Sequence, residues 1–400
     1  MTTRGFCNSL MKGNGKARLR KAGLAAVVNL ACMGSGNADQ TFNLGNDQSL
    51  SLGFGLRTDY TYLQDSAPNG TSNASAFNVD DTRLYLSGQV NRWFKGTFNT
   101  ERDSTGKVQM MDGFTELALD DDFNLRLGRE IPPSDRSNLD GPFYLNAWSF
   151  PLVSDYPNYA IGRDNGLMAW GKPLGGKLVY SVGAFTGHNV YAGGSNAAAN
   201  LLYAGRLAIN FLDPEPAPAY YTASTYYGAK NILTLGLVYQ YQKDGVGDST
   251  MTAGDYNSWN ADLLYEQKLA DAGVVTVEGA YYHYGLGAVD CGTAEPGSVP
   301  CTTVGNNIGG LVAGKAYLAT LEYMFPQKIG PGNIQPFIRY QDFERDLSQT
   351  TDKQTDLGVN YVIDGHNARI SAVYSRLNDT QLLAALANRN QFVLGVQFQY

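Results

Sequence analysis

Hydrophobic and polar residues alternate with a period of two along much of the chain. In residues 389–400, five apolar or aromatic side chains share one parity: Phe392, Leu394, Val396, Phe398 and Tyr400. Residues 49–62 repeat this pattern, with leucine, phenylalanine or tyrosine at most alternate positions. Successive side chains of a β-strand point to opposite faces, so each segment predicts a strand with one apolar face and one mostly polar face.

Sixteen segments of this kind follow one another: 49–62, 79–91, 94–102, 108–119, 123–129, 166–172, 177–186, 200–212, 231–242, 257–268, 273–284, 315–325, 333–344, 354–363, 368–377 and 389–400. Most are close to the ~9–11 residues that a tilted strand needs to cross a bilayer. Short connections such as 91–93 and 364–367 alternate with longer ones rich in Gly, Ser, Asn and Asp. We therefore predict an all-β fold, a transmembrane antiparallel β-barrel of 16 strands with short periplasmic turns and long extracellular loops.

One connection departs from this alternation. Residues 213–230 lie where a short periplasmic turn is expected, yet the segment is long, rich in proline and carries Tyr220, Tyr221, Tyr226 and Tyr227. The strand pattern offers no physical reason for its length.

Composition agrees with an all-β membrane protein. The chain has 46 Gly, 26 Tyr and 17 Phe among 400 residues, and only 17% of its residues are charged. Ordinary soluble domains have ~7% Gly and ~25% charged residues. No apolar run reaches the roughly 18 residues of a membrane-spanning helix, and an open sheet in lipid would leave its edge amides unpaired, so a closed barrel is favoured. A secreted soluble β-protein would show the same alternation and remains the alternative.

The first 38 residues have the order of a secretory signal peptide. Six basic residues and no acidic ones precede the apolar stretch 22–33, and small residues ending at Ala38 follow it. We predict cleavage after Ala38, which makes 1–38 the signal peptide and 39–400 the barrel. A soluble or membrane-anchoring helix is the alternative for this segment. Cleavage leaves 24 basic and 37 acidic residues, a net charge of −13, so nucleic acid is not an expected partner.

Export also bears on the cysteines. Cys291 and Cys301 are the cysteines of the predicted mature chain, in a stretch rich in Gly, Pro and Thr. In an oxidising compartment such a pair predicts a local disulfide. A metal site would need further ligands, which are not found nearby, so we expect no metal.

Several motifs recur in order along the chain: Phe123-Asn124-Leu125-Arg126-Leu127-Gly128-Arg129, Pro132-Pro133-Ser134-Asp135-Arg136, Gly162-Arg163-Asp164-Asn165-Gly166, Gln335-Pro336-Phe337-Ile338-Arg339-Tyr340-Gln341, and Gly358-Val359-Asn360-Tyr361 followed by Gly365-His366-Asn367-Ala368. With them the chain resembles the phosphate-selective porin O and P family of outer-membrane porins over the whole predicted mature region. The resemblance implies a 16-stranded channel in the bacterial outer membrane, commonly a homotrimer, with the third extracellular loop folded inward. It extends to porins proposed for short-chain amides and urea.

Residues 130–165 are the longest stretch without a predicted strand, independently of this resemblance. A structureless loop of that length in a compact protein is normally functional. Its charges lie among Pro, Tyr, Phe and Trp148, which favours an ordered pore constriction. The candidate constriction residues are Arg129, Asp135, Arg136, Asp140, Asp155, Arg163 and Asp164. A loop that caps the outside of the barrel or packs on a neighbouring subunit is the alternative.

Strand parity also assigns the charges of the pore lumen. The inward parity carries seven basic residues, Arg57, Arg83, Lys95, Arg126, Arg206, Arg339 and Arg369. It also carries eight acidic ones, Asp59, Glu101, Glu116, Asp262, Glu266, Glu278, Glu322 and Asp356. Rings of one charge sign make anion or cation pores, so a balanced lumen favours small neutral or zwitterionic solutes, or weak ion preference. Cross-strand pairing would reduce about half of these charges to wall contacts, in line with the modest worth of such pairs. Arginines clustered at the constriction would still permit anion preference.

Catalytic chemistry is not indicated. His188, His283 and His366 lie in a loop, at a strand end and in a turn, and no Gly-x-Ser-x-Gly nucleophile motif accompanies them. We predict no enzyme activity and no cofactor. Two functions compete: a diffusion channel for small solutes or ions, in contact with outer-membrane lipid, and a structural or surface-interaction barrel that acts through the long loops 63–78, 187–199 and 285–314.

Overall fold

A computed structural model describes residues 39–102, 106–155, 162–187, 199–216, 221–246, 254–287, 311–379 and 388–400. The predicted signal peptide and the predicted disulfide between Cys291 and Cys301 lie outside these ranges, so both stay predictions. The strands are β1 (Asp39–Gly45), β2 (Gln48–Leu63), β3 (Ala74–Gln89), β4 (Phe94–Arg102), β5 (Val108–Ala118), β6 (Asn124–Glu130), β7 (Asp164–Gly171), β8 (Leu178–Phe185), β9 (Leu202–Asn210), β10 (Ile232–Val246), β11 (Gly254–Lys268), β12 (Val274–Leu286), β13 (Gly314–Met324), β14 (Lys328–Ile329), β15 (Gly332–Arg345), β16 (Thr350–Asp364), β17 (Ala368–Asp379) and β18 (Asn388–Gln399).

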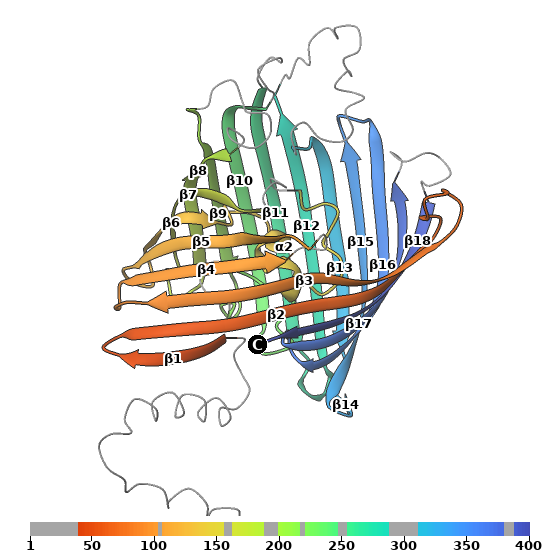
Figure 1. Ribbon diagram of the computed structural model, residues 1–400, viewed down its shortest axis with the longest axis horizontal. Helices are drawn as coiled ribbons and strands as arrows, with labels where there is room; N and C mark the ends of the chain where they lie inside the picture. Colours follow the sequence, from red (N-terminus) through yellow and green to blue (C-terminus); the bar gives the residue numbers. More distant parts are fainter. Residues whose placement is uncertain are drawn as a thin grey trace, which may run out of the picture. The chain divides into compact units, whose positions relative to one another are not determined.

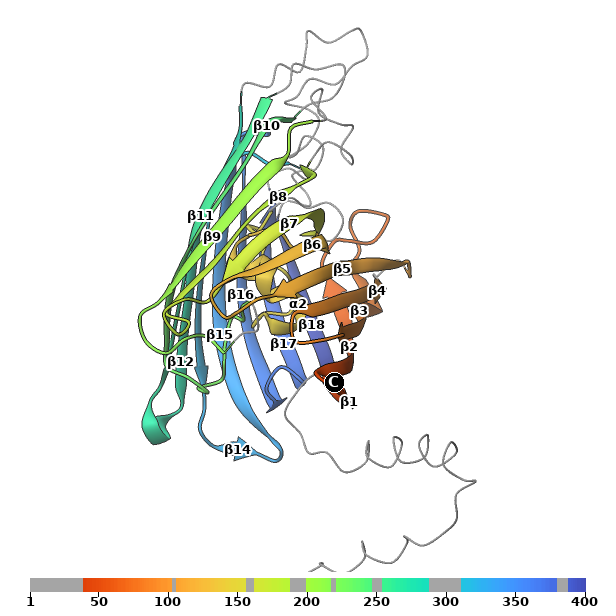
Figure 2. The same ribbon diagram turned by 90° about the vertical axis from the view of Figure 1, so that its left-hand side faces the viewer.

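Sixteen of these strands close into an antiparallel barrel. From β2 onward each strand of the barrel pairs with the next, β13 pairs with β15, and β18 returns to pair with β2 from Gln391 opposite Leu63 to Gln399 opposite Gly55. All 16 predicted strands are present, which confirms the predicted fold class. The largest difference is at β3, which begins five residues before the predicted segment. Figures 1 and 2 show the strands side by side around the wall.

Two short strands lie outside this count. Strand β1 pairs with the first part of β2, from Asp39 opposite Gly53 to Gly45 opposite Gln48, and so continues the edge that β18 occupies further along β2. Strand β14 pairs with the start of β15 within the turn between β13 and β15. Closure leaves the barrel without an open edge of unpaired amides, which is the requirement for a sheet in lipid.

Burial follows the predicted parity. In β18, Phe392, Leu394, Val396 and Phe398 are exposed, whereas Val393, Gln397 and Gln399 are buried. In β11, the inward positions Ser258, Asn260, Asp262 and Glu266 are all at most 2% exposed. The barrel therefore has an apolar outer surface and a mostly polar, well-filled interior, the reverse of a soluble sheet protein.

The connection between β6 and β7 carries a helix, α2 (Arg136–Tyr144), which lies inside the barrel in both views (Figures 1 and 2). The helix is broken at Gly141, whose φ of 59° is accessible to glycine at little cost. Pro142 follows, and a residue before proline avoids the helical region. Among the residues that the structure describes, no helix is long and apolar enough to cross a membrane.

Candidate functional site

The loop between β6 and β7, residues 131–163 and hereafter the inward loop, fills the barrel interior. Its described part is 131–155 and 162–163. Its backbone carbonyls accept hydrogen bonds from inward side chains of strands all around the wall: Arg369 donates to Leu145 (2.7 Å), Arg339 to Ser149 (3.0 Å), Gln397 to Phe143 (2.8 Å), Gln240 to Pro133 (2.7 Å) and Asn360 to Asn146 (3.1 Å). A buried carbonyl without a partner is costly. The wall side chains therefore stabilise the loop inside the lumen.

Aromatic side chains of the inward loop fit against glycines of the wall. A Cβ atom on Gly55 would lie 2.7 Å from the ring of Phe143, and one on Gly395 would lie 2.6 Å from the ring of Trp148. The Trp148 ring also lies 4.1 Å from the guanidinium carbon of Arg57, a cation–π distance. The loop is thus held by close packing as well as by hydrogen bonds.

The long connection 213–230, hereafter the inserted turn, enters the lumen from the opposite end. Its described part is 213–216 and 221–230. Glu215 receives two hydrogen bonds from the Arg136 guanidinium, at 2.9 and 2.7 Å. Asp140 accepts hydrogen bonds from Thr222 (2.6 Å) and Ser224 (2.7 Å). The segment that the strand pattern could not explain is therefore the partner of the inward loop.

Backbone contacts extend this junction. The Ser224 amide donates to the Tyr144 carbonyl at 3.1 Å, and the Asn146 side-chain amide donates to the Ser224 carbonyl at 3.0 Å. Asn146 also donates to Glu322 of β13. One residue of the inward loop thereby links the inserted turn to the wall.

The inserted turn is also fixed to the wall itself. The Glu266 carboxylate of β11 accepts hydrogen bonds from the Thr225 hydroxyl (2.6 Å) and from the amides of Tyr226 (2.9 Å) and Gly228 (2.8 Å). A carboxylate that accepts several backbone amides holds a turn in one conformation. Glu266 therefore anchors the inserted turn.

His366, in the turn between β16 and β17, meets both inward segments. Its Nε2 lies 2.9 Å from the Thr225 carbonyl, and its ring lies 4.8 Å from the Tyr227 ring and 4.9 Å from the Tyr144 ring. Burial and, to a smaller extent, the positive charge of Arg369 together lower the pKa of His366 to about 3. The imidazole is therefore neutral near neutral pH.

The predicted constriction residues do not form one cluster. Arg136 and Asp140 lie at the junction just described, and Asp135 accepts a hydrogen bond from the Tyr282 hydroxyl at 2.9 Å. Arg163 pairs with Asp112 of β5 at 3.0 Å. The others lie apart: Asp155 is 3.5 Å from Arg345, Asp164 begins β7 and accepts the Gly187 amide at 2.6 Å, and Arg129 belongs to β6 and donates to the Met111 carbonyl at 3.2 Å. Whether these residues control conduction stays a prediction.

The predicted lumen arginines lie on the inward face, and all six are at most 6% exposed. Five of them pair with carboxylates: Arg57 with Asp81 (2.7 Å), Arg83 with Glu101 (3.3 Å), Arg126 with Glu116, Arg206 with Asp262 (2.8 Å) and Arg339 with Asp356 (2.7 Å). Arg369 instead donates to the Leu145 carbonyl and, at 3.2 Å, to Gln397. Lys95 is 44% exposed in its side chain and lies 3.7 Å from Glu116. Pairing of the lumen arginines is more extensive than half, so few arginines without an ion pair face the lumen from these strands.

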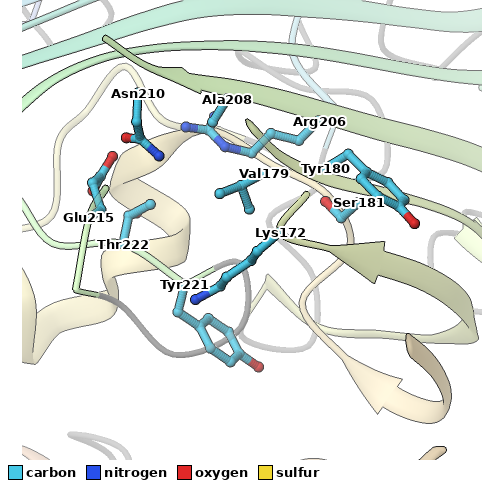
Figure 3. A pocket seen from close by; sticks show the side chains of 10 residues that line it. All are labelled: Lys172, Val179, Tyr180, Ser181, Arg206, Ala208, Asn210, Glu215, Tyr221 and Thr222. Carbon is cyan, nitrogen blue, oxygen red and sulfur yellow. The ribbon is translucent and has the colours of Figure 1, made fainter. Parts of the chain in front are cut away.

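A cavity of about 20 Å³ lies between the inserted turn and the wall at β8 and β9 (Figure 3). Its lining residues come from the turn after β7, from β8, from β9 and from the inserted turn: Lys172, Val179, Tyr180, Ser181, Arg206, Ala208, Asn210, Glu215, Tyr221 and Thr222. Burial lowers the pKa of Lys172. The inserted turn thus packs on the wall without filling all the space behind it.

Neither a catalytic nor a metal centre emerges from the described residues. His283 lies at an outward position of β12, 6.0 Å from the Trp259 ring, and His188 is outside the described ranges. No group of three His, Cys, Asp or Glu side chains in the described part of the chain is placed to hold a metal ion. The polar groups of the lumen serve hydrogen bonds and ion pairs.

The chain has the fold of bacterial outer-membrane porins. It matches no protein-family model and no curated protein. Among solved structures it is similar to an anion-selective porin from Comamonas acidovorans, with 14% identity, coverage of 88% of this chain and 100% of that chain, and a TM-score of 0.57. It is similar to Salmonella typhi OmpF in complex with daunomycin, with 12% identity, coverage of 90% and 100%, and a TM-score of 0.55. A trimer form of OmpT, an outer-membrane protein of Vibrio cholerae, has 11% identity, coverage of 88% and 99%, and a TM-score of 0.51. These similarities support a porin fold in general and do not single out the phosphate-selective porin O and P family.

Replacing Glu215 tests the junction between the two inward segments. Glu215→Gln removes the charge that pairs with buried Arg136, and breaking a buried ion pair costs ~3–5 kcal/mol, less where an amide keeps one hydrogen bond. We expect the two segments to separate more often, giving a larger and noisier single-channel conductance. The control is Asp213→Asn, which removes a charge from the same segment, where the Asp213 carboxylate accepts a hydrogen bond from the Asn231 amide. A conductance equal to that of the parent in Glu215→Gln would contradict this role.

The lowered pKa of His366 predicts a pH dependence of stability. In the unfolded chain this imidazole titrates at its ordinary value of about 6.5, whereas in the folded chain its pKa is about 3. Between these values the unfolded state binds the extra proton, so the contribution of His366 is complete above about pH 6.5 and is lost as the pH falls, by at most about 1.4 kcal/mol per pH unit. We expect the melting temperature of the parent to fall more between about pH 7 and about pH 5 than that of His366→Gln. Parallel pH profiles of the two proteins would rule this out.

Proposed function

We propose that this chain is a bacterial outer-membrane porin, a passive diffusion channel for small hydrophilic solutes or ions. The observation that carries the proposal is a closed 16-stranded barrel with an apolar outer surface and a polar lumen, which is narrowed from opposite ends by the inward loop and the inserted turn. The exposed leucine, phenylalanine and tyrosine side chains of the outer surface suit contact with outer-membrane lipid. We assign the chain no catalytic role and no cofactor.

The charge arrangement favours small neutral or zwitterionic solutes over a strong ion preference. Five lumen arginines are neutralised by carboxylates, and an anion pore requires rings of unpaired Arg or Lys. A phosphate-selective or anion-selective channel is the second candidate, supported by the buried guanidinium of Arg369, which is bonded to a carbonyl and an amide oxygen. The motifs that resemble the phosphate-selective porin O and P family support a place near that family. No feature of the described residues favours a purely structural or surface-interaction barrel.

We also propose that the functional unit is a homotrimer. The support is the resemblance to the porin O and P family and the similarity to OmpT of Vibrio cholerae, which has been described in a trimer form. Sedimentation of the detergent-solubilised protein should give three times the mass of the mature chain. A monomeric mass under conditions that preserve the barrel would refute this assembly.

Conductance and reversal potential test the channel and its selectivity together. Purified protein in planar bilayers should give stepwise conductance, and in a tenfold KCl gradient the reversal potential should stay far below the about 59 mV of an ideally selective channel. Arg136→Ala and Arg163→Ala each leave a carboxylate without its arginine, so both should shift the potential towards cation preference. The control is Arg92→Ala, which removes an arginine that stacks on Trp93 in the turn after β3.

Each outcome decides a different point. Absence of conductance in the parent would remove the channel hypothesis. A potential close to the anion limit would replace the neutral or zwitterionic solute with the anion-selective candidate. Unchanged selectivity in both arginine variants would remove the inward loop from the selectivity-determining residues.

A further inference from the structure

The outward face of the wall carries a band of tyrosines near the end of the barrel where residues 287–313 connect β12 to β13. Tyr281 on β12 lies directly opposite Tyr317 on β13. In the strand register, Tyr340 on β15 is displaced from Tyr317 by two residues towards the opposite end, and Tyr374 on β17 by two further residues. Barrel strands are tilted, so a steady displacement of this kind traces a level line around the wall. Aromatic girdles lie at the membrane interface of such barrels, so these four residues, hereafter the tyrosine band, mark the interface at this end.

Beyond the tyrosine band, the same outward face becomes basic. Lys315 on β13 and Arg376 on β17 each lie two residues beyond a tyrosine of the band. Lys353 is outward on β16, which runs between β15 and β17 (Figure 1). On the flanking strands β11 and β18, the positions two residues beyond an outward aromatic are Asn257 and Asn390, which carry no charge. Lys315, Lys353 and Arg376, hereafter the basic patch, therefore form a local group of positive charges.

The cations of the basic patch are available to a ligand. Lys353 lies opposite Asn378, two residues from Arg376, and diagonal neighbours of this kind are ~7–8 Å apart. Lys315 and Arg376 are exposed, and neither forms an ion pair within the described part of the chain. Lys353, whose side chain is 49% exposed, pairs with Asp342 at 3.1 Å.

Asp342 holds Lys353 in place and leaves part of its ammonium free to bind. The Oδ2 atom of Asp342 also accepts hydrogen bonds from the hydroxyls of Tyr317 (3.2 Å) and Tyr340 (3.1 Å). An ammonium has three N–H donors, so one bond to Asp342 leaves donors for a further acceptor. Glu344, opposite Lys315, adds a second carboxylate, and the three cations of the patch keep a net positive charge.

The level of the basic patch indicates its ligand. A charge that faces lipid is costly at the bilayer midplane and is tolerated near the interface. On the other side of the tyrosine band, Leu321, Ile338 and Leu357 are exposed and apolar, so the patch lies where acyl chains end and headgroups begin. Phosphates are the common anions of lipid headgroups, and long basic side chains reach them while their aliphatic stems stay on the apolar surface.

We propose that the basic patch is a binding site for a phosphate-bearing lipid of the outer leaflet, because the end with the long connections faces outwards in barrels of this kind. One phosphate lies between Lys353 and Arg376, a second lies at Lys315, and the acyl chains lie on the apolar surface beside the tyrosine band. A neighbouring subunit fits this surface less well, since lysine is depleted at the core of protein interfaces. The site is on the outer surface, so it is independent of conduction through the lumen.

Two lipids that differ in one phosphate test the site. Lipid A with two phosphates and monophosphoryl lipid A with the same acyl chains are each titrated into the detergent-solubilised protein, and bound lipid is counted by native mass spectrometry. We expect the lipid with two phosphates to bind more tightly. Arg376→Gln should raise its Kd about fivefold, equivalent to about 1 kcal/mol, the usual contribution of one basic residue near an anionic lipid surface. Lys315→Gln should narrow the difference between the two lipids.

Two further variants complete the design. Lys328→Gln removes an exposed lysine from β14, at the opposite end of the same wall, and should leave both affinities unchanged. Arg376→Lys keeps the charge and should retain most of the affinity. Lys315 and Arg376 lie on different strands, so either glutamine variant carries the test if the other does not assemble.

Three results would overturn the proposal. Equal affinity of the parent for the two lipids would show that phosphate is not recognised. A loss of affinity in Lys328→Gln equal to that in Arg376→Gln would assign the effect to the overall charge of the protein. A fall from an oligomeric to a monomeric mass in Arg376→Gln, with lipid binding unchanged, would assign the basic patch to a contact between subunits.

Discussion

The arrangement of this lumen depends on one requirement, that the backbone of a long loop placed inside a barrel must find hydrogen-bond partners. The closed wall uses its own amides and carbonyls between strands, so it has no backbone groups to offer. Side chains of the wall supply them, as Arg369 does for Leu145, Arg339 for Ser149 and Gln397 for Phe143. Arginine is well suited because its planar guanidinium can serve a carboxylate and a carbonyl together. The inward arginines are thus structural donors to the inward loop before they are pore charges.

The inserted turn supplies further hydrogen-bond and ion-pair partners for side chains of the inward loop. Asp140 and Arg136 face the inserted turn, which supplies Thr222, Ser224 and Glu215 as their partners. Arg136 also lies 3.6 Å from Asp262 of the wall strand β11. Segments from opposite ends of the barrel are therefore coupled at its centre. A displacement of either one exposes a buried charge on the other, which makes the two segments move together rather than independently.

The sequence could predict the wall because parity is a local property. Alternation located all 16 strands and placed residues such as Arg57 and Asp262 on the inward face. It could also locate the inward loop by its length. The hydrogen-bond partners of these inward residues could not be predicted from the sequence. Arg369 and Leu145 are 224 residues apart and Arg136 and Glu215 are 79 residues apart, and strand parity does not say which distant segments meet. The unusual length of 213–230 was the signal in the sequence for the inserted turn. Glu215 was not identified, although an acidic residue among prolines and tyrosines is suited to a buried partner.

Most charged side chains of the described lumen form ion pairs, and the few that do not bear on the selectivity of the channel. Arg369, on β17, is bonded to oxygen atoms that carry no full charge. On the other side, Glu278 on β12 and Glu322 on β13 are buried without an ion pair in the described chain, and Glu322 is bonded to the amides of Asn146 and Gln335. In the described part of the lumen, the side chains without an ion pair therefore include both signs, and neither sign forms a ring of like charges around the wall. Such a ring is what makes a pore select ions by sign, so this arrangement agrees with a weak ion preference.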